Sequence, residues 1–462
     1  MFIGNLCCFC CRSLKTLINR GISLQQSVQQ RCNKVGFFFP LGNDSERFVR
    51  LTGIQTNKCS ISIVHQKFRF VKSHDNTVSR HTAAPVPGFG RRKDFNSLER
   101  QAILMSDSIK KLNEILKERH TAALITSEEN VRYFTSFSST NGYLVLTGNS
   151  SIFLTDSRYI EAAKNQITSC DEVTEIKTVS ETLVPLLENL GLRKIEIEAG
   201  RMTVNTLNAY KKAFPFAEIV SDGALDKAID RLRAVKTEEE KEKIEQAQRI
   251  AEKAFDHILT FIKPGMTERE VSLALDFTML RSGADALSFE TIAVSGKNGS
   301  MPHGVPGNTK IENGDFVTMD FGAVVDGYHS DMTRTIAVGN VSDEQKKVYD
   351  TVLRAQKAAL SAVKSGETCR TVDLKARDII TGSGYGEFFG HGTGHGVGIE
   401  IHEFPTVSFR SETVLESGNV ITVEPGIYLP GRFGVRIEDM VYVTEKGCYN
   451  FTKCEKELII VK

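Results

Sequence analysis

Two aspartates in a short predicted hairpin are the first residues whose spacing suggests chemistry. Residues 319–335 read MDFGAVVDGYHSDMTRT, and Asp326-Gly327 is a strong signal for a two-residue turn between apolar strands. With that turn, Asp320 and Asp331 are diagonal neighbours on one face, about 7–8 Å apart at Cα. Carboxylates this close on a buried face repel each other and resist desolvation. A cation between them would remove both objections.

His329 lies on the same predicted face, because side chains alternate along a strand. Alternation alone therefore does not choose the ligands among these three residues. Two alternatives stay open at this point. One is a solvated hairpin face that binds no metal, and the other is a β-bulge that changes which residues share the face.

Three histidines follow in a segment rich in glycine. Residues 390–403 read GHGTGHGVGIEIHE and include His391, His395 and His402. Glycine at this density suits close backbone packing or the approach of a ligand. A phosphate-binding loop is the alternative interpretation, but the segment contains neither of the common glycine-rich phosphate motifs. Nucleotide binding is therefore disfavoured.

Two glutamates stand among apolar residues nearer the C-terminus. Glu424 closes the apolar run of VITVEPGIY, and Glu438 is predicted to lie inside a strand, GVRIEDMVYV. Carboxylates embedded in Val/Ile strands are uncommon unless they are paired. Four acids and a histidine cluster on separate strands favour a metal site over a solvated surface.

These segments together resemble the pita-bread metallopeptidases, and within them the branch of Xaa-Pro aminopeptidases and prolidases. The resemblance covers residues 105–462, and the motifs occur in the family's order with matching local spacing. They are SMPHG at 300–304, MDFGAVVDGYHSDMTRT, GHGTGHGVGIEIHE, VEPGIY and GVRIED. The resemblance implies an α+β fold in which a creatinase-type α/β domain precedes a pita-bread catalytic domain.

The same resemblance implies a dinuclear metal centre in which Asp331 and Glu438 bridge the ions. The implied ligands are Asp320, Asp331, His395, Glu424 and Glu438. Four carboxylates and one imidazole form a hard, oxygen-rich set that favours Mn²⁺, with Zn²⁺ and Co²⁺ as competitors. Two such ions, about 3.5–4 Å apart, hold a bridging hydroxide and polarise the scissile carbonyl.

Further residues correspond to positions that line the family's substrate site. The implied substrate-binding residues are His303, His391, His402 and Arg436. His303 and His402 are also implied to act in catalysis, together with Glu424 as the proton acceptor from water. For His391, structural packing within the glycine-rich segment is the alternative interpretation.

The implied activity is that of an aminopeptidase that hydrolyses the Xaa-Pro bond at the N-terminus of short proline-containing peptides. Strict Xaa-Pro dipeptidase action is the close alternative; it needs a cation for the substrate's C-terminal carboxylate, for which Arg410 is a candidate. Methionine aminopeptidases share the metal site but usually lack a preceding domain, and Pro302-His303 favours the proline-directed branch. A binding module without metals is disfavoured, because all five ligands are present. The resemblance also implies a homodimer or larger homo-oligomer, and neither a nucleic-acid nor a membrane partner is predicted.

Length and pattern predict the elements that must position these residues. A chain of 462 residues favours two domains plus extensions. Alternating helices and strands predict an α/β domain over residues 105–230, beginning with an amphipathic helix from Met105. The catalytic domain is predicted over 231–462. Helices are predicted after the capping boxes Thr237–Glu240 and Thr267–Glu270, and also near 343–364 and 371–382.

Residues 1–104 differ in composition from the remainder. The first 100 residues carry 16 basic and 5 acidic side chains and six of the ten cysteines. We predict a poorly ordered extension, or upstream sequence without function. Scattered cysteines favour a reducing compartment, and the cytoplasm is the preferred location. A mitochondrial location is the alternative if the basic segment is a transit peptide.

Overall fold

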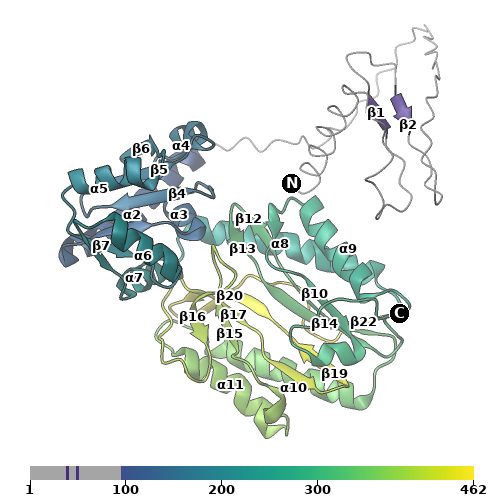
Figure 1. The fold of residues 1–462 in the computed structure, drawn as a ribbon. Coiled ribbons are helices and arrows are strands. Elements are labelled where there is room, and N and C mark those ends of the chain that lie inside the picture. Colours follow the sequence, from purple (N-terminus) through teal and green to yellow (C-terminus); the bar gives the residue numbers. More distant parts are fainter. Residues whose placement is uncertain (1–37, 41–47, 51–94) are drawn as a thin grey trace. The chain divides into compact units, whose positions relative to one another are not determined.

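The computed structural model describes the backbone of residues 38–40, 48–50 and 95–462, and side chains from residue 107 onward. Strands β1 (Phe38–Pro40) and β2 (Phe48–Arg50) pair antiparallel within a unit that spans Met1–Gly90 (Figure 1). Residues Arg91–Lys462 form a separate compact unit. The prediction that residues 1–104 are a poorly ordered extension falls almost entirely outside the described residues.

The first domain of the large unit is a mixed sheet covered by helices (Figure 1). Its strands are β3 (Ala122–Ile125), β4 (Gly142–Leu146), β5 (Ser151–Thr155), β6 (Glu172–Glu175), β7 (Lys194–Ile197) and β8 (Glu218–Val220). Its helices are α2 (Phe95–Arg119), α3 (Glu128–Thr135), α4 (Ile160–Gln166), α5 (Val184–Asn189), α6 (Val204–Ala213) and α7 (Ala224–Ala234), with a π-helical turn, η1 (Val179–Leu183). The strand order is β6-β5-β4-β3-β7-β8, and β4 runs antiparallel to both of its neighbours.

Two boundaries of this domain differ from the sequence prediction. Helix α2 begins at Phe95, ten residues before Met105, and α7 continues to Ala234, past residue 230. The apolar face predicted for α2 is confirmed, because Leu112 and Leu116 are fully buried against the sheet. Element ends are the least certain part of a pattern-based prediction, since helical spacing says little about the last turn.

The second domain contains four long helices in two pairs. They are α8 (Glu238–Phe261), α9 (Glu268–Arg281), α10 (Asp343–Ala362) and α11 (Cys369–Gly382). Both predicted capping boxes are confirmed: Thr237 and Thr267 each accept the N–H of the glutamate three residues on, whose side chain bonds back. These caps satisfy backbone N–H groups that a helix start leaves unpaired.

The strands of the second domain lie between the helix pairs (Figure 1). They are β9 (Ala286–Leu287), β10 (Ile292–Ser295), β11 (Phe316–Phe321), β12 (Ala323–Val325), β13 (Tyr328–His329), β14 (Met332–Val338), β15 (Gly394–Gly396), β16 (Glu403–Val407), β17 (Val420–Val423), β18 (Gly426–Leu429), β19 (Phe433–Arg436), β20 (Asp439–Thr444), β21 (Gly447–Asn450) and β22 (Ile460–Val461). Two short 3₁₀ turns, η2 (Gly296–Ser300) and η3 (Gly386–Phe388), complete the domain. Helices α8 and α9 share an apolar core with β11 and β14, and α10 and α11 share one with β17 to β20.

The predicted hairpin register is confirmed. Val325 pairs with Tyr328 across the turn, and Asp320 pairs with Thr333 in the same register farther along. Asp326 and Gly327 both adopt positive φ, 48° and 84°, as a two-residue hairpin turn requires. A side chain at Gly322 would collide with the backbone carbonyl oxygen of Ser330, so the strands can approach here only with glycine.

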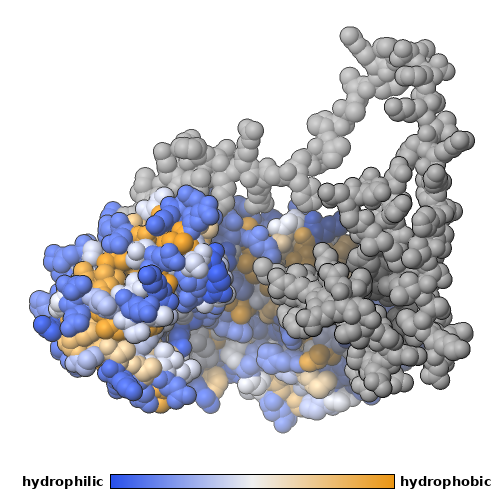
Figure 2. Space-filling model, turned by 45° about the horizontal axis from the view of Figure 1, so that its top comes forward, coloured by the Kyte–Doolittle hydropathy of each residue, from blue (hydrophilic) through white to orange (hydrophobic). Residues whose placement is uncertain are grey.

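The surface of the described residues carries both hydrophilic and hydrophobic side chains (Figure 2). On the face shown in Figure 2, hydrophilic residues surround smaller hydrophobic patches. None of the helices within the described residues is both long enough and apolar enough to cross a bilayer.

Candidate metal centre

The five predicted ligands lie on neighbouring strands of the second domain or at their ends. Asp320 is on β11, His395 is on β15, and Glu424 directly follows β17. Asp331 directly precedes β14. Glu438 was expected inside a strand, but it stands at the break between β19 and β20, where its N–H donates to the carbonyl of Thr333 at 3.1 Å. The break turns the side chain inward without losing the backbone hydrogen bond.

Three of these side chains meet in one cluster. One ligand atom each from Asp331, His395 and Glu438 lies within 4.8 Å of the other two. Glu424 adjoins the cluster, with its Oε1 atom 3.4 Å from His395 Nε2. Asp320 is close enough to raise the pKa of Asp331 by charge repulsion. The fold thus brings together residues that are up to 118 positions apart in the sequence.

Three carboxylates of the cluster each leave one oxygen without a partner, and two of them are held through the other oxygen. Arg436 donates to Asp320 Oδ2 at 2.6 Å, and Thr333 Oγ1 donates to Glu438 Oε2 at 2.7 Å. Asp320 Oδ1, Asp331 Oδ1 and Glu438 Oε1 are buried and accept no hydrogen bond. Buried polar atoms are normally paired, so three orphaned oxygens in one place fit a missing cationic partner.

The imidazole of His395 is oriented for coordination. Its Nδ1 atom lies 3.0 Å from the carbonyl oxygen of Gly396, a bond that requires a proton on Nδ1. The lone pair is then on Nε2, which faces Asp331 at 3.6 Å. Its backbone N–H donates to Thr422 Oγ1, and that hydroxyl donates to Glu424 Oε1 at 3.1 Å. The hydrogen bond from Nδ1 to Gly396 is the kind that fixes the tautomer of a metal-binding histidine.

The buried carboxyl groups of the cluster would be stabilised in their ionised form by nearby positive charge. Burial raises the pKa of Asp331 and of Glu438 well above the ordinary range, and repulsion among the neighbouring carboxylates raises both further. Burial likewise raises the pKa of Glu424. Bound cations would reverse these shifts, because a nearby opposite charge favours the ionised form. The donor set therefore fits divalent cations.

Glycines let the strands approach around His395. A side chain at Gly394 would collide with the carbonyl oxygen of Thr422, and one at Gly396 with the carbonyl oxygen of Phe404. The density of glycine in 390–403 is thus explained by close backbone packing, one of the two interpretations made from the sequence.

The three other predicted histidines have different environments. His303 and His402 are exposed, and the His402 ring lies edge-on to His395 with centroids 4.4 Å apart. Of these two rings, only His402 is accessible to a substrate from the solvent, because His395 is largely buried. Burial and the neighbouring histidines lower the pKa of His402, so its neutral form is favoured at neutral pH.

His391 is bound within the protein. Its Nδ1 atom lies 2.7 Å from the carbonyl oxygen of Gly392, and its Nε2 atom lies 3.0 Å from the hydroxyl of Tyr428. A carbonyl oxygen can only accept, so Nδ1 carries the proton and Nε2 of the neutral ring accepts from the Tyr428 hydroxyl, which itself accepts from Arg436 at 2.9 Å. Both nitrogens of His391 are therefore occupied, which supports its alternative, structural role.

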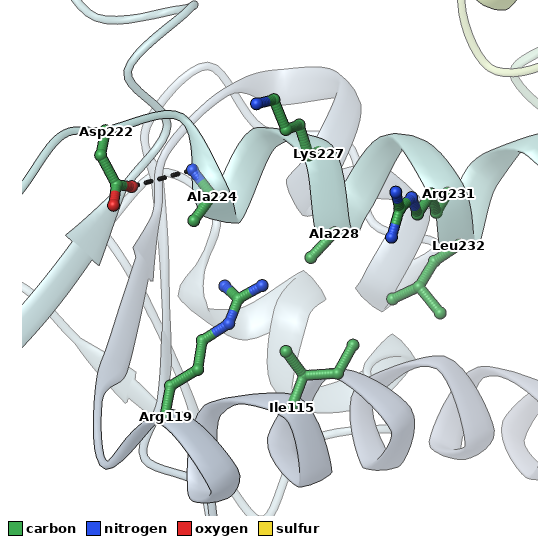
Figure 3. A pocket seen from close by; sticks show the side chains of 8 residues that line it. All are labelled: Ile115, Arg119, Asp222, Ala224, Lys227, Ala228, Arg231 and Leu232. Atoms are coloured by element: carbon green, nitrogen blue, oxygen red, sulfur yellow. Dashed lines mark hydrogen bonds between the residues drawn. The ribbon is translucent and has the colours of Figure 1, made fainter. Parts of the chain in front are cut away.

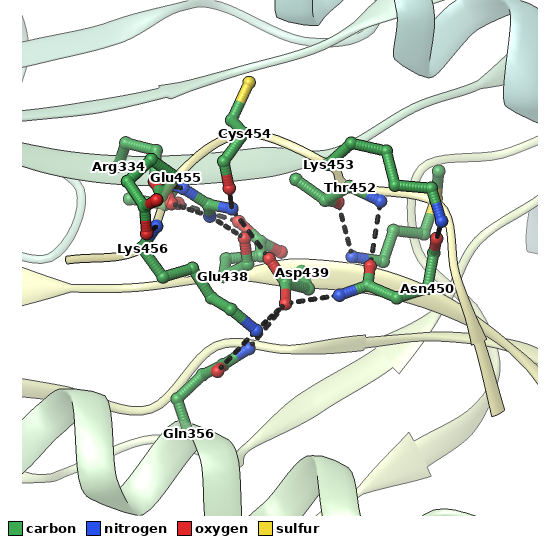
Figure 4. Close-up of polar contacts among 12 residues, drawn as sticks. Arg334, Gln356, Glu438, Asp439, Asn450, Thr452, Lys453, Cys454, Glu455 and Lys456 are labelled. Atoms are coloured by element: carbon green, nitrogen blue, oxygen red, sulfur yellow. Dashed lines mark hydrogen bonds and ion pairs between the residues drawn. The ribbon is translucent and has the colours of Figure 1, made fainter. Parts of the chain in front are cut away.

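A buried ion pair fixes the backbone beside Glu438. Arg334 donates to the carbonyl oxygen of Glu438 and pairs with Asp439 at 2.8 Å, with 1% and 0% of their side chains exposed. Figure 4 shows that Lys456 and Gln356 also converge on Asp439. Charges this deeply buried persist only when they are fully paired. The network supports the strand break from which Glu438 points into the cluster.

A separate hollow lies in the first domain, between α2 and α7 (Figure 3). Its volume is about 510 Å³, and it contains none of the predicted ligands. The residues that line it are Ile115, Arg119, Asp222, Ala224, Lys227, Ala228, Arg231 and Leu232. The basic lining distinguishes this hollow from the acidic candidate metal centre.

Three residues that support the site were not predicted from the sequence: Thr333, Thr422 and Tyr428. Each supplies a hydroxyl that bonds a predicted ligand or a residue beside one. Alternation along β14 could have indicated Thr333, which follows Asp331 by two residues and shares its face. For Tyr428 the sequence offers only its place in VEPGIY.

Comparison with known proteins identifies the family of the chain. Residues 242–445 match the model of metallopeptidase family M24, and residues 109–235 match the creatinase/prolidase N-terminal domain. The Xaa-Pro dipeptidase of Pyrococcus horikoshii is 40% identical over 358 residues, which is 77% of this chain and 99% of that protein. The structure of a Xaa-Pro dipeptidase from Bacillus anthracis is 42% identical, with a TM-score of 0.73, and the match covers 78% of this chain and 99% of that one.

An X-Pro aminopeptidase from Thermotoga maritima is also similar. It is 37% identical, with a TM-score of 0.69 over 74% of this chain and 97% of that one. The relatives thus carry both names, and the similarity extends over almost their full length. The fold, the acidic cluster and these matches together place the chain in the M24 metallopeptidases, as a metallo-exopeptidase with a creatinase-type N-terminal domain and a pita-bread catalytic domain.

Proposed function

We propose that this chain hydrolyses the Xaa-Pro bond at the N-terminus of short peptides, with Asp320, Asp331, His395, Glu424 and Glu438 as the ligands of two divalent cations. The observation that carries the proposal is the set of three orphaned carboxylate oxygens beside His395 Nε2. Ions bound there would supply Lewis-acid polarisation of the scissile carbonyl and would acidify a water molecule. Mn²⁺ suits the oxygen-rich donor set best, ahead of Zn²⁺ and Co²⁺.

Glu424 is suited to take a proton from the attacking water. Its Oε1 atom accepts from Thr422 at 3.1 Å, which fixes the carboxylate and leaves Oε2 to receive the proton. A carboxylate held in this way is positioned to act as a general base toward a neighbouring water molecule.

The exposed imidazoles of His303 and His402 are suited to bind the peptide. His402 packs against His395, and His303 is near enough to His402 for its charge to act on that ring; each can donate a hydrogen bond to a peptide carbonyl oxygen. Arg436 has a different environment from these histidines, because it is buried. Its bonds to Tyr428 and Asp320 occupy its terminal nitrogens, so it orients Asp320 rather than reaching into solvent.

Strict dipeptidase action is the second candidate. It is favoured by the names of two of the similar proteins, the Xaa-Pro dipeptidases of P. horikoshii and B. anthracis. The Arg410 side chain, the predicted partner for a substrate carboxylate, is exposed and stacks over the ring of Phe409 at 4.9 Å.

One assay separates the two candidates. Purified protein loaded with Mn²⁺ is given Xaa-Pro and Xaa-Pro-Yaa peptides that share the first residue, and released Xaa is quantified. An aminopeptidase cleaves both, whereas a dipeptidase cleaves only the first. Absence of turnover on both peptides by protein with stoichiometric metal would refute the proposed function.

A further inference from the structure

A buried group of charges follows directly after His402 in the chain. Glu403 accepts from Arg233 and from Lys236, the latter at 3.0 Å. Only 4% of the Glu403 side chain is exposed, and the two cations are 4% and 1% exposed. Removing three charges from water is costly, and their pairing with one another offsets that cost. One carboxylate therefore holds two buried cations from a distant part of the chain.

Arg233 is fixed on the side of the first domain, whereas the backbone N–H of Lys236 donates to the carbonyl oxygen of Gly418 in the second domain at 2.8 Å. Arg233 belongs to the last turn of α7 and donates to Asn130 Oδ1 at 2.7 Å. Asn130 in turn donates to Glu198 Oε1 at 2.7 Å, and Glu198 accepts the backbone N–H of Ser127 at 2.9 Å. This chain of bonds ties the guanidinium to the end of the first domain's sheet.

The carboxylate is fixed on the side of the loop. Glu403 Oε1 accepts the N–H of Glu400 at 3.0 Å, and the carbonyl of Glu400 accepts the N–H of Gly398 at 3.0 Å. A Cβ on Gly398 would lie 2.5 Å from Glu403 Oε2, so the loop closes tightly on that side chain. Arg233 also pairs with Glu400 at 2.7 Å. The loop from Gly398 to Glu403 is thus folded around one ion-paired carboxylate.

The ring of His402 has no such fixation of its own. Among the described residues its only packing partner in ring geometry is His395, and no side-chain hydrogen bond to His402 is present. The position of the His402 imidazole therefore depends on the position of its backbone. That backbone is anchored by the next residue, Glu403, through its ion pairs.

We propose that Arg233 and Lys236 are positioning residues, which hold His402 at the metal centre through Glu403 and so make the first domain a contributor to turnover. The inference rests on the proposed function, in which His402 binds the peptide. It predicts that breaking the ion pair costs activity only through His402. Metal binding should be unaffected, because none of the five proposed ligands contacts these three residues.

The test is a double-mutant cycle. Glu403→Gln should lower kcat/KM on Xaa-Pro substrates about 10–100-fold with unchanged metal stoichiometry, comparable to His402→Ala. The double variant should be no worse than His402→Ala alone, because residues that act through one another are not additive. Additive losses, or loss of metal from folded Glu403→Gln, would overturn the proposal.

Milder variants keep the test decisive if Glu403→Gln fails to fold. Lys236→Met leaves Arg233 in place and should lower kcat/KM several-fold, with restoration in Lys236→Arg and no effect in the His402→Ala background. The matched control is Glu196→Gln, a buried carboxylate paired with Arg119 at 2.8 Å in the first domain. It should keep wild-type kcat and KM. An inactive wild-type enzyme would instead refute the proposed function itself.

Discussion

Asp331→Asn should change the stability of the metal-free protein and the activity of the loaded protein in opposite directions. The substitution keeps the shape of the side chain and removes one negative charge. In the metal-free protein, Asp331 Oδ1 is buried without a partner, and Glu438 and Asp320 raise the pKa of the carboxyl by repulsion. Asparagine leaves a polar atom in the same place but carries no charge. Burying a charged group without a partner costs at least about 1–3 kcal/mol, so the metal-free variant should be more stable than metal-free wild type by about that amount.

In the loaded protein the same change should be damaging. The loss of an outer partner of a metal ligand costs about 10–100-fold in affinity, so the loss of a ligand oxygen should exceed about 100-fold. Turnover should fall with it. Calorimetric titration with Mn²⁺ measures the affinity, and urea unfolding in chelator measures the stability of the metal-free form.

Two results would contradict this reasoning. Stoichiometric metal and wild-type turnover in Asp331→Asn would show that the aspartate is not a ligand. A metal-free variant that is less stable than metal-free wild type would show that the carboxylates do not repel one another. Asp350→Asn, the same exchange at an exposed position of α10, serves as the control and should alter neither quantity appreciably.

Three further outcomes are expected. Burial alone would raise the pKa of Glu403, but pairing with Lys236 and Arg233 outweighs it and lowers the pKa from 4.5 to about 2. This net shift is worth about 3 kcal/mol of stability. Because the folded pKa is depressed, this stability is present above pH 4.5 and is lost as the pH falls toward 2; the stability gap between wild type and Glu403→Gln in urea titrations should narrow over that window. Thr333→Val should weaken Mn²⁺ binding about 10–100-fold in calorimetry, since Glu438 loses its outer donor. Gly394→Ala should lower the melting temperature and metal content together, because its Cβ has no room beside the backbone of Thr422.

The sequence alone determined the features that depend on near neighbours in the chain. The Asp-Gly turn set the hairpin register, because few residue pairs adopt two positive φ angles, and that register placed Asp320 diagonal to Asp331. Capping boxes gave the starts of α8 and α9 for the same local reason. Carboxylates in apolar strands were visible as candidates because their burial requires a partner.

Only the tertiary structure decided which of those candidates meet, and how. It brought one ligand atom each of Asp331, His395 and Glu438 within 4.8 Å of one another, and it placed His391 in hydrogen-bond contact with Tyr428. It also paired Glu403 with Arg233, 170 residues away. The spacing of residues in the sequence does not predict such pairs, because they depend on how separate strands and domains pack. Once a charged side chain is buried by that packing, it requires an oppositely charged partner.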